Sequence, residues 1–268
     1  ASDVYKRQFF VEVEDWAGRI GISECVSFKT NWYLPETIEE DFRVVRDVIA
    51  PIVLGERYIH PSQVSRSLAT FADLARYPMA KAAVEPALWD LYGKIVGKPL
   101  SKLIGGSNQE KILGGAVIGL GTADEVCAQV DAAVQAGYTR VKLKVKPDTV
   151  LACVEAIRKA HPDLIIMLDA NQSFDESNLD ILCRLDEFDI ACIEEPYNPS
   201  FVPRNGDTNL FARLSDLQEH IKTPVCLDES VVTAQDMEEA MDFDNLKCYA
   251  LKAVSYTHLR AHETRRHL

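Results

Sequence analysis

Five short apolar runs in this chain each end in a charged residue, in the order Lys, Asp, Glu, Asp, Lys. The closing residues are Lys144, Asp169, Glu194, Asp228 and Lys252, spaced 25, 25, 34 and 24 residues apart. A charged group at the end of a buried strand is costly unless it faces a site. Three carboxylates suit a hard divalent cation, and two amines beside them can move protons. The pattern therefore predicts a metal-assisted acid–base site.

The runs and the segments between them predict a repeated β/α unit. Short, largely apolar runs between turn signals are typical of strands buried on both faces of a parallel sheet, and each intervening segment is long enough for one amphipathic helix. In a β/α barrel the C-terminal strand ends build the site, so the charged residues would meet there. An insertion at 197–209, rich in Pro and Asn, accounts for the longest spacing, and we expect it to shape substrate access.

A second lysine shares the strand that Lys144 closes. Lys142 and Lys144 have the same parity, so both side chains point into the barrel. Two neighbouring ammonium groups beside a metal depress each other's pKa, which prepares one as a general base. Lys146 shares this parity but lies beyond the strand end, and we expect it to be solvated. A lone Asp in such a place is usually a helix cap, but the regular repeat favours the functional interpretation.

An α+β block precedes the repeat. Residues 9–14 and 20–26 have alternating or continuous apolar positions, and a turn separates the two segments. This pattern predicts a hairpin. Helices are predicted to start near Pro35, Pro61 and Met79. The third of these contains an internal proline, which should remove a backbone hydrogen bond and kink the helix. The first barrel strand is expected at about 112–118, and Thr122 with Glu125 forms a capping box for the helix that follows.

Both ends of the sequence look foreign to the protein. A nucleotide string that encodes Asp3–Gln8 overlaps the reverse complement of a string that encodes Val254–Leu259, the pattern of a translated library adapter. The alternative for the second segment is a genuine basic tail. We therefore expect non-native sequence at 1–8 and 254–268. The native part would comprise a capping domain at 9–110, without its first strand, and a partial barrel with the catalytic residues at 111–253.

Composition limits the partners and the compartment. A net charge of −12 argues against nucleic acid or an anionic membrane as the main partner. No apolar run approaches the ~18 residues of a membrane span, and no signal peptide is recognisable. The seven cysteines are scattered and never form a Cys-x-x-Cys pair. This usage predicts a reducing cytoplasm, no disulfide framework and no zinc site.

Several short motifs give the pattern a family resemblance. Besides the Lys-x-Lys pair, they are Met79-Ala-Lys-Ala-Ala83, Leu168-Asp-Ala-Asn171, Ile193-Glu-Glu-Pro196 and Cys226-Leu-Asp-Glu-Ser230. The sequence resembles the muconate-lactonizing subgroup of the enolase superfamily, and within it the o-succinylbenzoate synthases and N-succinylamino acid racemases. The resemblance implies an α/β fold of enolase type, with an α+β capping domain followed by a modified TIM-type (β/α)7β barrel, truncated here at both ends.

The resemblance also implies roles for the charged residues. Mg²⁺, with Mn²⁺ as an alternative, would be held by Asp169, Glu194 and Asp228. Lys144 would abstract a proton α to the substrate carboxylate, with electrostatic support from Lys142, and the metal would stabilise the enediolate. The implied partner is a small-molecule carboxylate, and a homo-oligomer is possible.

Two reactions remain open on these residues. In the synthase interpretation, which implies dehydration to o-succinylbenzoate in menaquinone biosynthesis, Lys144 returns the proton to the departing hydroxyl group. Lys252 then stabilises the intermediate from the other face. In the racemase or dipeptide epimerase interpretation, Lys252 is the second base.

Departures from the family pattern bear on specificity and completeness. Pro86 lies in a capping-domain helix, and Val117 stands where the resemblance to several relatives implies a serine, so this position offers no hydroxyl group for a substrate hydrogen bond. A hypothesis of another class is that the chain as given is an inactive truncated fragment. Six strands of an eight-stranded barrel would leave two unpaired edges.

Overall fold

The computed structural model of the chain describes residues 8–31, 35–106, 114–203, 206, 208–232 and 234–250. These residues form two compact units, one built from residues up to 106 and the other from residues 114–250. Within the described ranges, no helix has both the length and the apolar character needed to cross a membrane. Lys252 and nearly all of the two segments expected to be non-native lie outside the described residues.

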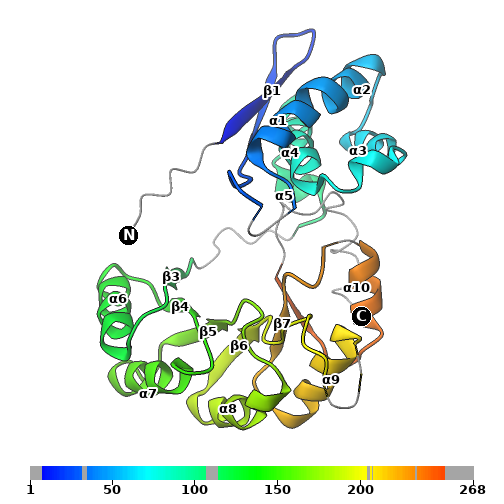
Figure 1. Cartoon of the computed structure of the whole chain (residues 1–268). Helices are drawn as coiled ribbons and strands as arrows, with labels where there is room; N and C mark the ends of the chain where they lie inside the picture. The colour runs from blue at the N-terminus through cyan, green and yellow to red at the C-terminus, as the bar shows by residue number, and fades with distance from the viewer. Residues whose placement is uncertain are drawn as a thin grey trace. The chain divides into compact units, whose positions relative to one another are not determined.

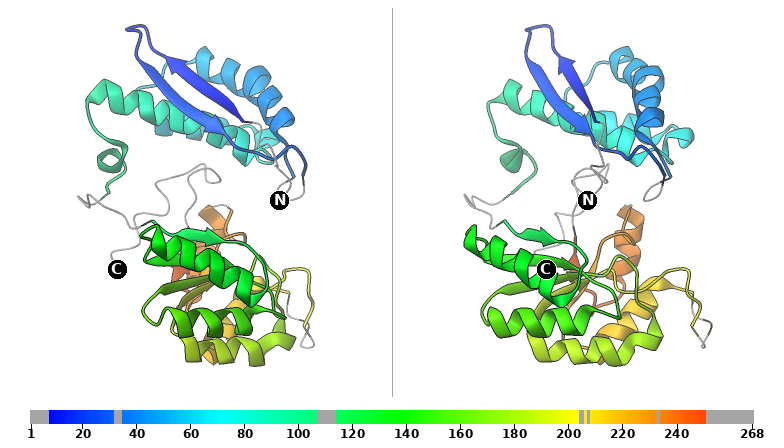
Figure 2. Two further views of the ribbon diagram at one scale, coloured as in Figure 1. Left: turned by 90° about the vertical axis from the view of Figure 1, so that its left-hand side faces the viewer. Right: turned by 60° about the vertical axis from the view of Figure 1, so that its left-hand side comes forward.

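The first unit is built on a hairpin that lies along helix α4 (Pro78–Val96), as Figure 2 shows. Strand β1 (Phe9–Glu14) pairs antiparallel with β2 (Ile20–Cys25), which confirms the predicted hairpin. Gly21 allows the close approach to α4, because a Cβ atom there would lie 2.0 Å from the carbonyl oxygen of Ala87. The absence of a side chain at this position therefore fixes how near the two elements can pack.

Five further helical elements of this unit pack around a small apolar core. They are α1 (Ile38–Val44), η1 (Val45–Ile49), α2 (Ala50–Gly55), α3 (Pro61–Ala69) and η2 (Ala72–Leu74), and the short helix α5 (Leu100–Leu103) follows α4. Helix α1 begins after Thr37, which forms a capping box with Glu40, slightly later than the predicted start at Pro35. The buried core residues are Ile49, Val64, Leu68, Leu74, Ala80 and Val84.

Helix α4 continues through its internal proline. Pro86 has no N–H group to donate, yet the helix runs unbroken until Gly97, whose φ of 65° ends it. One turn before the proline, the hydroxyl of Ser23 on β2 donates a hydrogen bond to the carbonyl oxygen of Ala83. The proline is therefore accommodated inside an intact helix.

The second unit is a six-stranded parallel sheet whose spatial order follows the chain. Its strands are β3 (Ala116–Ile118), β4 (Arg140–Lys144), β5 (Ile165–Asp169), β6 (Ile190–Glu194), β7 (Val225–Leu227) and β8 (Cys248–Tyr249). Helices α6 to α9 follow one another along one side of this sheet (Figure 1). Consecutive strands that pair in parallel through helical crossovers confirm the predicted β/α repeat. Among the described residues, β3 and β8 are the edge strands.

The helical elements of this unit begin close to the predicted places. They are α6 (Ala123–Gln135), α7 (Val150–Ala160), η3 (Glu176–Asn178), α8 (Leu179–Leu185), η4 (Asp186–Phe188), α9 (Leu210–His220) and α10 (Ala234–Met241). The capping box of Thr122 and Glu125 is present at the start of α6, as the sequence predicts.

Strand register aligns five polar side chains across the sheet. Lys144 pairs with Asp169, Asp169 with Glu194, Glu194 with Cys226, and Cys226 with Cys248. Registered partners on neighbouring parallel strands project to the same side of a sheet. We call this set the register row. It places the predicted base, two predicted metal ligands and two thiols on one side of the sheet.

Candidate active site

Three buried carboxylates lie at or directly after the ends of adjacent strands. Asp169 and Glu194 are the last residues of β5 and β6, and Asp228 directly follows β7. Their exposed fractions are 2%, 2% and 4%. Hydrophobic residues fill the alternate positions of these strands, so the carboxylates are carried into the interior by the strand pattern. Asp169 and Glu194 share the ammonium group of Lys142, and the negative charge of Asp228 acts on Glu194.

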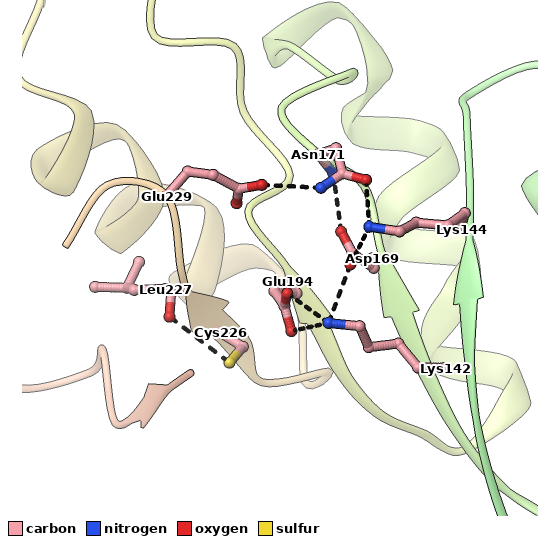
Figure 3. Close-up of polar contacts among 8 residues, drawn as sticks. All are labelled: Lys142, Lys144, Asp169, Asn171, Glu194, Cys226, Leu227 and Glu229. Carbon is pink, nitrogen blue, oxygen red and sulfur yellow. Dashed lines mark hydrogen bonds and ion pairs between the residues drawn. The ribbon is translucent and has the colours of Figure 1, made fainter. Parts of the chain in front are cut away.

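Two lysines of β4 extend toward these carboxylates, as Figure 3 shows. The ammonium nitrogen of Lys144 donates to Oδ2 of Asp169 at 2.6 Å. That of Lys142 donates to Oε1 of Glu194 at 2.7 Å and lies 3.0 Å from Oδ2 of Asp169. Lys146 is exposed, as predicted. The fifth residue of the predicted set, Lys252, lies outside the described residues.

The carboxylates differ in how readily they ionise. Burial raises the pKa of Glu194 to about 7; the hydrogen bond from Lys142 opposes this shift, and the charges of Asp169 and Asp228 add to it. Burial also acts to raise the pKa of Asp169, but hydrogen bonds from Lys144 and Lys142 outweigh it and lower that pKa. Repulsion among the carboxylates is therefore only partly relieved by the two lysines.

Among the protein groups alone, the pKa of Lys142 is raised rather than depressed. Burial does act to lower its pKa, but hydrogen bonds and charge attraction from Glu194 and Asp169 outweigh burial, and the pKa is raised. The predicted depression of the lysine pKa concerned two ammonium groups beside a bound metal. The nearer groups in the structure are carboxylates, and these stabilise the charged form.

The donor set fits a hard divalent cation. All three carboxylates supply oxygen, which Mg²⁺ and Mn²⁺ prefer, and each stands at the end of a strand or directly after it. Burial, together with the charges of Asp169 and Asp228, raises the pKa of Glu194, and a cation would favour the ionised form of this carboxyl group. The ammonium group of Lys142 contacts both Asp169 and Glu194, so it already neutralises part of the charge that a cation would neutralise.

Asn171 is a site residue that the sequence analysis did not assign. Its side-chain oxygen accepts a hydrogen bond from Lys144 at 2.7 Å, and its amide nitrogen donates to Glu229 at 2.8 Å (Figure 3). The residue has a φ of 43°, a left-handed conformation that asparagine tolerates better than most residues. Asn171 thus holds the Lys144 amine from the loop after β5. It belongs to the Leu168–Asn171 motif, which was the available signal.

Glu195 is a second site residue to which the sequence assigned no role, although it belongs to the Ile193–Pro196 motif. It is only 1% exposed and has a φ of 40°. Its carboxylate accepts hydrogen bonds from the backbone N–H of Ser230 at 2.7 Å and from the hydroxyl of Ser230 at 2.6 Å. Burial raises the pKa of Glu195 to about 7. The pair fastens the loop after β7, which carries Asp228, to the end of β6.

Two features bear on substrate specificity. Val117 on β3 is in register with Lys142 and is 65% exposed, so its side chain faces the same side of the sheet as the site. The 197–209 insertion lies between β6 and α9, and its described part is anchored by Arg213 of α9. The Arg213 guanidinium donates to the carbonyl oxygen of Asn198 at 3.2 Å and pairs with Glu176 at 2.5 Å.

Comparison with known proteins follows the division into two units. Residues 4–105 match the N-terminal domain of the mandelate racemase / muconate lactonizing enzyme family, and residues 125–256 match the enolase C-terminal domain-like family. The o-succinylbenzoate synthase of Bacillus subtilis (strain 168) is 33% identical over 92% of this chain and 63% of its own length. The N-succinylamino acid racemase of Thermus thermophilus is 32% identical over 88% of this chain and 60% of its own length.

Solved structures show the same fold. The structure of a probable mandelate racemase from Alicyclobacillus acidocaldarius matches with a TM-score of 0.82 and 30% sequence identity, over 95% of this chain and 66% of that one. The chain spans about 63% of the length of the o-succinylbenzoate synthase that it matches.

Proposed function

Because the chain belongs to the mandelate racemase / muconate lactonizing enzyme family of the enolase superfamily, we propose that it removes a proton α to a substrate carboxylate with Lys144 as the general base. The observation that carries the proposal is the 2.6 Å contact between Lys144 and Asp169 on neighbouring strand ends. This contact places an amine beside the group proposed to hold the metal. A substrate carboxylate bound at that metal would present its α carbon to the same amine.

Asp169, Glu194 and Asp228 are the residues proposed to hold Mg²⁺. When bound, Mg²⁺ supplies electrostatic stabilisation for negative charge on the substrate carboxylate. Lys142, 3.0 Å from Asp169, adds a second positive charge on the same side. Lys144 accepts the α proton, and Asn171 holds its amine in place through the 2.7 Å hydrogen bond.

We propose dehydration to o-succinylbenzoate as the reaction. The similarity to the Bacillus subtilis synthase supports this choice. In this reaction Lys144 gives its proton to the departing hydroxyl group, and Lys252 is proposed to stabilise the opposite face of the intermediate.

Racemisation of N-succinylamino acids is the second candidate reaction, supported by the Thermus thermophilus relative. In that reaction Lys252 would exchange the α proton on the other face of the substrate. The seven free thiols support a reducing, cytoplasmic location.

One experiment separates these reactions and tests the base. The chain is incubated with MgCl₂ in D₂O, either with the cyclohexadiene-carboxylate precursor or with N-succinylamino acids. Dehydration is followed by ultraviolet absorbance, and α-proton exchange is followed by NMR. Lys144→Ala is compared with Lys146→Ala, which removes an exposed lysine two residues away. Folded, cation-binding protein that neither dehydrates nor exchanges any of these substrates would overturn the proposal and favour the inactive-fragment hypothesis.

A further inference from the structure

Three thiols from separate strands gather in the second unit. Cys192 lies on β6, Cys226 on β7 and Cys248 on β8. Their sulfur atoms all lie within 4.8 Å of one another. Cys192 and Cys226 are each 3% exposed, and Cys248 is partly buried. We call this group the thiol cluster.

The thiol cluster lies on the same side of the sheet as the carboxylates. Cys226 and Cys248 belong to the register row, and Figure 3 shows Cys226 on the strand beside Glu194. Cys192 precedes Glu194 by two residues on one strand, so its side chain has the same orientation. No step of the proposed proton transfer uses these thiols. Their convergence therefore calls for a separate chemical interpretation.

The donor chemistry of the cluster differs from that of the carboxylates. Mg²⁺ binds oxygen, whereas thiolates select thiophilic ions such as Zn²⁺ and Cd²⁺. A zinc–sulfur bond of about 2.3 Å with tetrahedral angles requires sulfur atoms about 3.8 Å apart. The observed limit of 4.8 Å leaves only a small contraction, which side-chain rotation can supply.

We propose that Cys192, Cys226 and Cys248 form a second cation site, which binds one thiophilic divalent ion separately from the carboxylate site. Binding breaks three S–H bonds and forms three metal–sulfur bonds, and the three protons pass to the solvent without any oxidation or reduction. A water molecule completes the tetrahedral arrangement around the ion.

Cadmium is the probe that distinguishes the two sites. The reduced full-length chain is titrated with CdCl₂ in the presence of excess MgCl₂, and the thiolate-to-cadmium charge-transfer band is followed in the ultraviolet. We expect one Cd²⁺ per chain to produce the band. Cys248→Ser should weaken binding by roughly tenfold or more, since one metal–sulfur bond is lost. Cys183→Ser is the matched control, because Cys183 is a partly buried cysteine of α8 outside the cluster.

The partly buried position of Cys248 makes its serine variant the least disruptive of the three, and circular dichroism checks its folding. A cadmium NMR spectrum of the unmodified chain gives an independent readout, since its chemical shift separates sulfur from oxygen donors. A wild-type chain without the charge-transfer band, an unchanged affinity in Cys248→Ser, an equal loss in Cys183→Ser, or an oxygen-donor shift would overturn the proposal.

Discussion

The ammonium group of Lys142 reaches across β5 and donates to both carboxylate oxygens of Glu194, at 2.7 and 3.0 Å. The same nitrogen lies 3.0 Å from Asp169. A protein cation thus stands between two of the proposed metal ligands. Metal binding and lysine pairing therefore compete for the same carboxylates, and the predictions below follow partly from this competition.

Replacing the proposed base should abolish proton transfer without loss of structure. Lys144→Ala is expected to lower the rate of α-proton exchange roughly 10²- to 10⁴-fold, the usual contribution of a general base. NMR in D₂O measures the exchange. Lys146→Ala should stay close to wild type because its side chain is exposed beyond the end of β4. Equal losses in the two variants would argue against a specific role for Lys144.

Glu194→Gln should weaken cation binding by at least roughly tenfold, because an anionic oxygen ligand is lost. Binding of Mn²⁺, followed by electron paramagnetic resonance, measures the effect. Glu187→Gln, at an exposed position of η4, serves as the control.

Lys142→Met should strengthen the binding of Mn²⁺, since it removes the ammonium group that competes with the cation for Asp169 and Glu194. A weaker Mn²⁺ affinity in Lys142→Met would contradict the competition.

Gly21→Ala should destabilise the first unit. The added Cβ would lie 2.0 Å from the carbonyl oxygen of Ala87 and 2.6 Å from the backbone nitrogen of Leu91, so the hairpin has to shift away from α4. Overpacking of this kind costs roughly 1–3 kcal/mol of unfolding free energy. All three tryptophans precede residue 108, so urea unfolding followed by tryptophan fluorescence reports on this unit.

The matched control is Gly55→Ala at the end of α2, where a Cβ would meet no atom within 4 Å. Its effect should stay within about 0.5 kcal/mol. Similar losses at both glycines would show that the contact with α4 is not the cause.

The stability of the first unit should fall as the pH rises through the titration of Glu85. Burial raises the pKa of Glu85 from 4.5 to about 7, and Ser65 donates a hydrogen bond to its carboxylate at 2.6 Å. An acid with a raised pKa in the folded state holds its proton more tightly there, so ionisation above pH 4.5 costs stability until about pH 7.

Glu85→Gln keeps an acceptor for Ser65 and removes this cost. It should be more stable than wild type by on the order of 1–3 kcal/mol at about pH 8, with the difference vanishing near about pH 4. Fluorescence-detected urea unfolding at both pH values provides the measurement, with exposed Glu56→Gln as the control. A difference that does not change with pH would contradict this account.

The sequence predicted the elements of the site because strand patterns are local. The runs that end at Lys144, Asp169 and Glu194 form strands that end at those residues, and Asp228 directly follows its strand. Alternation within one strand placed Lys142 beside Lys144. The family resemblance added the fold of both units, which the structural comparison confirms.

The contacts between strands could not be predicted in the same way. The Lys142–Glu194 pairing, the hold of Asn171 on Lys144 and the convergence of three thiols all depend on which residues share a register. Cysteine spacing along the chain gave no sign of the cluster, since its members come from three different strands. Left-handed backbone at Asn171 and Glu195 likewise depends on how the strand ends meet their neighbours.

The register row has a consequence for insertions and deletions. Deleting Ile193 from β6 would turn the Glu194 side chain from the site side of the sheet toward the helices. The carboxylate would then leave Lys142, while Cys192 would keep its place. A deletion scan should therefore find these strands intolerant of length changes even at positions where apolar exchanges are accepted.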